Sequence, residues 1–144
     1  MSTYCFAYGH GTKEFEYNEA DILKVVRTKD FTPMQDVEHQ VLQAVENPIG
    51  SPALSEIIKP GDTVAFICND PTRVANSDIF MPILVNEMNR LGVPDENMRI
   101  VFSLGTHRAM TDAEMVEQVG AEVAGRLKMY NSIATNQDDF EYFG

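Results

Sequence analysis

The stretch that decides the fold runs from Thr63 to Arg73 and reads TVAFICNDPTR. Its first six residues are almost all apolar, as in a central parallel strand that is buried on both faces. Its last five are polar or turn-forming, so the strand ends abruptly in a loop. A second stretch from Met98 to Arg108, MRIVFSLGTHR, repeats this arrangement. Both loops are therefore predicted at the carboxyl edge of one sheet, where open α/β sheets bind ligands.

Helical patterns separate the predicted strands. Phe80, Leu84 and Met88 recur at helical spacing between the two stretches, and Gly92 is placed to end that helix. Thr111 with Glu114 forms a capping box that opens a helix running to about Val119. Residues 129–131 follow as a third strand. This order predicts an α/β fold, a doubly wound, mainly parallel sheet of the Rossmann-like type.

The N-terminal third predicts a hairpin and a helix. Residues 4–8 and 14–17 flank a glycine-bracketed turn, and the second run alternates Glu with Phe or Tyr. Thr32 and Pro33 are predicted as the cap and first residue of a helix that ends at Asn47. Residues 138–144 resemble the start of another strand. We expect residues 1–144 to form a single α/β domain, the N-terminal domain of a longer two-domain enzyme.

Composition limits the partners and the compartment. The chain has 144 residues, 44% of them apolar, and a formal net charge of -11. Such a surface repels nucleic acid and anionic membranes. The sequence shows neither a signal-peptide pattern nor an apolar run of the ~20 residues that span a bilayer. Cys5 and Cys68 both lie in apolar runs and are expected to be small, buried and reduced. These features predict a cytoplasmic protein.

The first loop contains groups suited to an anion. Arg73 carries a planar guanidinium that fits a carboxylate or a phosphate, and a helix beginning near Ser77 adds a positive dipole end. The alternative is that Asp70 and Thr72 are turn residues that hydrogen-bond their own backbone. Local sequence does not decide between the two interpretations.

The second loop contains a titratable side chain. Gly105 permits a tight exit from the strand, and the His107 imidazole can take and return a proton near neutral pH. In the alternative interpretation His107 only satisfies a loop carbonyl. Arg108 is a second cation suited to an anionic ligand, whereas His10 and His39 are expected on the solvated surface. The sequence contains no His, Cys, Asp or Glu cluster with metal-ligand spacing.

Five blocks in order carry a family resemblance: YGHG at 8–11, NPIGSP at 47–52, NDPTR at 69–73, LGVPDEN at 91–97 and GTHRAMT at 105–111. The chain resembles the N-terminal domain of the nickel-pincer lactate racemases. These enzymes invert a 2-hydroxy acid by hydride transfer to a nickel-pincer nucleotide (pyridinium-3,5-bisthiocarboxylic acid mononucleotide nickel). The resemblance implies that His107 is the general base and acid. It also implies that Asp70, Pro71, Thr72 and Arg73 line the cofactor, with Arg73 reaching the substrate carboxylate.

The resemblance also marks what this chain lacks. The family's second acid/base, its cofactor lysine and its nickel ligand come later in the chain than residue 144. Where relatives often have Asn-His, this sequence has Asn131 and Ser132. We therefore expect these residues to need the C-terminal domain of the same parent chain, and to be inactive and without bound cofactor alone. Two alternatives stay open: a stand-alone nucleotide- or organic-acid-binding module without catalysis, and an enzyme for a 2-hydroxy acid other than lactate.

Overall fold

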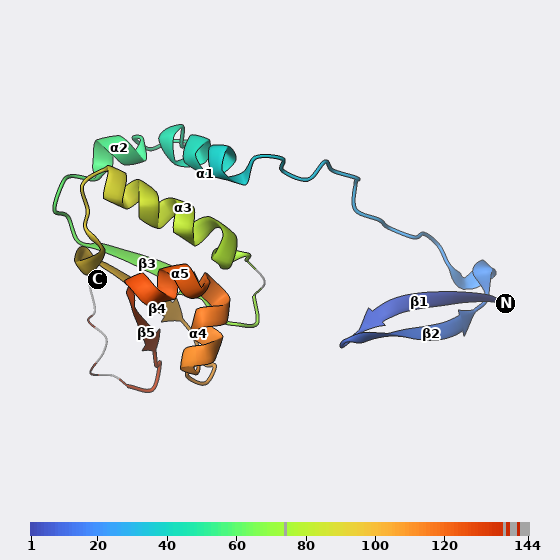
Figure 1. Ribbon diagram of the computed structural model, residues 1–144. Helices are drawn as coiled ribbons and strands as arrows, with labels where there is room; N and C mark the ends of the chain where they lie inside the picture. Colours follow the sequence, from blue (N-terminus) through green and yellow to red (C-terminus); the bar gives the residue numbers. More distant parts are fainter. Residues whose placement is uncertain (74, 137, 139–140, 142–144) are drawn as a thin grey trace. The chain divides into compact units, whose positions relative to one another are not determined.

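The computed structural model describes residues 1–73, 75–136, 138 and 141 (Figure 1). These residues divide into two compact units, 1–33 and 34–144, each described here by itself. That residues 1–144 form a single domain stays a prediction. No helix in the described part of the chain combines the length and apolar character needed to cross a membrane.

The first unit is the predicted β-hairpin. Strand β1 (Ser2–Tyr8) pairs antiparallel with β2 (Gly11–Tyr17), and Gly9 turns the chain at φ 59°. A short 3-10 helix, η1 (Glu19–Asp21), follows. The pairing of Tyr4 with Phe15 gathers aromatic rings on one face, while Cys5 pairs with Glu14 on the other. Cys5 is exposed, so its predicted burial is wrong: it pairs with the polar Glu14, on the face of the hairpin away from the aromatic rings.

The second unit contains the predicted parallel sheet. Its elements are α1 (Val37–Glu46), α2 (Leu54–Ile57), β3 (Val64–Asn69), α3 (Ser77–Arg90), η2 (Asp95–Asn97), β4 (Met98–Ser103), α4 (Asp112–Val119), α5 (Ala121–Arg126) and β5 (Lys128–Ser132). The three strands are parallel and lie in the order β3-β4-β5. The mixed α/β fold with a parallel sheet and a hairpin is thus confirmed, and the doubly wound, Rossmann-like arrangement stays a prediction.

The core lies between the sheet and its helices. Phe102 and Ile100 of β4 are fully buried, together with Met81 and Val85 of α3 and Val119 of α4. Cys68 is buried in the same cluster, as predicted. Because α3, α4 and α5 all contribute to this cluster, they cover the same face of the sheet (Figure 1). This packing holds the carboxyl ends of β3 and β4 side by side.

Two sequence predictions about element ends need comment. Helix α1 begins at Val37 and not after Thr32, because the Asp36 carboxylate accepts a hydrogen bond from the His39 N–H at 3.0 Å and caps the helix there. The predicted strand at 138–144 falls almost entirely outside the described residues.

Candidate active site

The loop after β3 is held by its own polar groups. The Asn69 side chain donates to the carbonyl of Arg73 at 2.8 Å and to that of Asp70 at 3.2 Å. The Arg73 N–H donates to the Asp70 carbonyl at 3.2 Å and closes a turn. The loop therefore returns on itself directly at the strand end and presents its side chains beyond the sheet.

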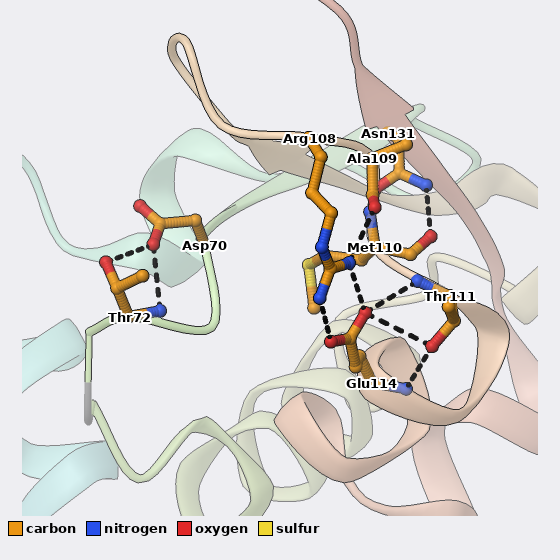
Figure 2. Close-up of polar contacts among 8 residues, drawn as sticks. All are labelled: Asp70, Thr72, Arg108, Ala109, Met110, Thr111, Glu114 and Asn131. Atoms are coloured by element: carbon orange, nitrogen blue, oxygen red, sulfur yellow. Dashed lines mark hydrogen bonds and ion pairs between the residues drawn. The ribbon is translucent and has the colours of Figure 1, made fainter. Parts of the chain in front are cut away.

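Asp70 is the anion of this loop. Its side chain accepts hydrogen bonds from the Thr72 hydroxyl and, at 2.8 Å, from the Thr72 N–H (Figure 2). These two bonds, and then the positive charges of His107 and Arg73, hold the pKa of Asp70 below its ordinary value. Asp70 is 8% exposed. The turn geometry of the alternative interpretation is thus present, and the same carboxylate also attracts cations from both loops.

The loop after β4 presents His107. Gly105 adopts φ 57°, and the His107 N–H donates to the Leu104 carbonyl at 3.0 Å, so the chain turns directly after the strand. The His107 side chain is exposed and makes no hydrogen bond to any residue that the structure describes. Its ring therefore satisfies no loop carbonyl there and is available to a ligand.

Arg108 is not an available cation, contrary to the sequence interpretation. Its guanidinium binds both carboxylate oxygens of Glu114, at 2.6 and 2.8 Å (Figure 2). The Arg108 hydrogen bonds, and then the Thr111 N–H at 2.8 Å, lower the pKa of Glu114 to about 2. Arg108 therefore ties the His107 loop to the start of α4.

Two hydrogen bonds connect the loop of His107 to β5. The Met110 N–H donates to Asn131 Oδ1 at 3.1 Å, and Asn131 Nδ2 donates to the Met110 carbonyl at 3.0 Å (Figure 2). Asn131 thus satisfies both backbone groups of Met110, a residue that is itself buried. These two hydrogen bonds, together with the Arg108–Glu114 ion pair, hold the segment from Arg108 to Met110 in place.

A groove of about 400 Å³ runs between the first loop and α4. Pro71 and Arg73 lie on one wall, and Glu114 and Glu117 of α4 on the other. The Arg73 guanidinium makes no ion pair within the described residues. His107 is not among the residues that line this groove. His107 lies on the neighbouring loop, because Ser103 at the end of β4 pairs with Asn69 at the end of β3.

The structure thus brings together the predicted Asp70, Pro71, Thr72 and Arg73 with the loop of His107. It adds two positioning residues that sequence reasoning missed, Glu114 and Asn131. Glu114 was visible only as a helix cap, since six positions separate it from Arg108 and no helical pairing rule covers that spacing. Asn131 was noted only as part of the Asn-Ser pair at 131–132, and nothing in the sequence indicated its contact with Met110, which is 21 residues away. No group of three or more His, Cys, Asp or Glu in the described part is arranged to hold a metal.

Comparisons with known proteins identify the family of the chain. Residues 8–144 match the family described as the lactate racemase N-terminal domain. The chain is 28% identical to a lactate racemase of Lactiplantibacillus plantarum over 107 residues, which are 74% of this chain and 25% of that protein. It is 26% identical to a lactate racemase of Thermoanaerobacterium thermosaccharolyticum over 139 residues, 95% of this chain and 32% of that protein. It spans between a quarter and a third of these relatives. The chain belongs to the lactate racemase N-terminal domain family.

Proposed function

We propose that this chain is the N-terminal part of a racemase or epimerase that inverts a lactate-type 2-hydroxy acid by hydride transfer with a nickel-pincer nucleotide. Family membership and the names of the two relatives support the reaction class. The observation that carries the proposal is that Asn69 and Ser103 pair at the ends of the parallel strands β3 and β4, so the loop with Arg73 and the loop with His107 leave the same edge of the sheet as neighbours.

The residues of the first loop fit a phosphorylated nucleotide. Arg73 makes no ion pair within the described part, and it lines the groove where α3, a helix of 14 residues, begins at Ser77. A helix start and a free guanidinium both favour an anion. Asp78, Glu114 and Glu117 also line the groove, and Arg108 already pairs with Glu114, so an anion is expected on the side of Arg73. When bound, the nickel-pincer nucleotide supplies the group that accepts and returns the substrate hydride.

The roles of the chain's own residues follow from their charges. His107 takes the proton of the substrate hydroxyl and later returns it. The Asp70 carboxylate stabilises the positive charge that the ring then carries. Arg73 binds the substrate carboxylate as well as the cofactor, and Asp70, Pro71 and Thr72 complete the cofactor-binding loop. Glu114 and Asn131 position the His107 loop without contacting substrate.

Racemisation requires proton transfer on both faces of the substrate, and the two loops present one imidazole. We therefore propose that the 144 residues are inactive alone and act with a C-terminal domain of the same parent chain, in the cytoplasm. We also propose that the sheet of the whole protein is doubly wound.

The test is turnover by the full-length polypeptide with assembled cofactor on a panel of chiral 2-hydroxy acids. His107→Ala should lower kcat by about 10²- to 10⁴-fold and leave cofactor binding intact, because it removes one acid/base group. His39→Ala is the matched control, since His39 is an exposed histidine of α1. Loss of nucleotide from the His107→Ala protein would instead assign His107 a ligand role and overturn its assignment as the base.

The second candidate is a stand-alone module that binds a nucleotide or an organic acid without turnover. Arg73 lines the groove at the start of α3 without an ion pair to any described residue, and this favours the module, because this part of the site lies within the chain. A reading frame that ends at Gly144, with binding of the nucleotide to the isolated chain, would support the module and contradict the enzyme.

A further inference from the structure

Among the described residues of the second unit, helices cover one face of the parallel sheet and no helix or strand covers the other. Phe66, Ile100 and Met129 point to the helical side and pack in or against the core. Their neighbours along each strand point to the other side. There Ile67 is 68% exposed and Tyr130 is 46% exposed. Parallel sheets of α/β proteins are normally covered on both faces, so this exposure is unusual.

The strand register divides the open face into three rows. The middle row is apolar, the row toward the strand starts is basic, and the row toward the strand ends is polar. The rows are Ile67, Val101 and Tyr130; Ala65, Arg99 and Lys128; and Asn69, Ser103 and Ser132. Arg99 and Lys128 are exposed and form no ion pair with a described residue, in a chain of net charge -11.

The dimensions of the face suit one helix. Neighbouring strands lie ~4.8 Å apart, so β3 and β5 are separated by roughly 10 Å. An α-helix with its side chains is about 10 Å wide, and its apolar stripe would cover the middle row. The cations Arg99 and Lys128 at one end of that row favour carboxylates on the helix, because a covering helix removes part of their water.

We propose that this face is the docking surface for an amphipathic helix that carries Asp or Glu opposite Arg99 and Lys128. The helix comes from a further part of the parent polypeptide, since the relatives are three to four times as long as their match to this chain. The inference rests on the proposed function in requiring a longer chain. It concerns the opposite side of the sheet from the helices that pack on the core.

The test compares thiol labelling of Ile67→Cys in the 144-residue chain and in the full polypeptide. Both carry Cys5→Ser, because Cys5 is exposed, whereas Cys68 is buried and its burial raises its pKa. Glu38→Cys, an exposed position of α1 on the helical side, is the matched control. We expect N-ethylmaleimide to label the Ile67→Cys site about tenfold or more slowly in the full polypeptide, with the control unchanged.

A second variant tests the charge. Arg99→Glu should accelerate labelling at the Ile67→Cys site in the full polypeptide and leave the rate in the 144-residue chain unchanged. Equal rates in the two polypeptides, or a reading frame that ends at Gly144, would overturn the proposal. So would concentration-dependent protection in the short chain, which would identify a second copy as the occupant. Labelling needs neither cofactor nor turnover, so protection without racemase activity would refute only the proposed function, and activity without protection only the docking surface.

Discussion

Replacing Asn131 with alanine removes the side chain that joins β5 to the His107 loop. Two hydrogen bonds are lost, one from the Met110 N–H at 3.1 Å and one to the Met110 carbonyl at 3.0 Å. Each contributes about 1 kcal/mol net, and the buried Met110 backbone finds no ready replacement, so we expect a loss of about 2 kcal/mol. For a unit of this size that corresponds to roughly 8 °C in Tm.

The assay is urea unfolding followed by circular dichroism, with a lower midpoint and an unchanged slope as the expected result. Asn47→Ala is the matched control. Asn47 also makes two side-chain hydrogen bonds, to Gln43, but it is exposed and water can replace them. We expect that control to lose no more than about 0.5 kcal/mol. Equal losses for Asn131→Ala and Asn47→Ala would refute the view that the Met110 bonds organise the loop.

Three further changes test other contacts. Glu114→Gln should flatten the pH dependence of unfolding in acid: the pKa of Glu114 is lowered from 4.5 to about 2, so its contribution is complete above pH 4.5 and disappears toward pH 2. An unchanged acid titration of stability would contradict the Arg108 ion pair. Thr111→Ala should cost about 1 kcal/mol through loss of the α4 cap, measured by urea unfolding, and a neutral effect would show that the cap is dispensable. Gly92→Ala should cost more than about 1 kcal/mol, because φ is 93° and the new Cβ would lie 2.9 Å from Pro60; a Tm within error of the unmodified chain would contradict this geometry.

The elements were predictable where the local pattern and the packing agree. The apolar run of β3 and the capping box at Thr111 each led to the correct element, because burial and capping are local requirements. The predicted start of α1 was wrong because the sequence contains two helix-capping signals four residues apart. Thr32 with Pro33 competes with Asp36, and the structure uses Asp36.

The candidate site was likewise predictable in part from the sequence. The sequence by itself determined that two polar loops follow two buried parallel strands, and that Asp70, Arg73 and His107 lie on them. Only the tertiary structure decided which cation is available. Arg108 forms an ion pair with Glu114, whereas Arg73 lines a groove and forms no ion pair with a described residue. The physical reason is that strand and helix periodicity is written in neighbouring residues, while the partner of a charge is chosen by which segments the packed sheet and helices bring within hydrogen-bonding distance.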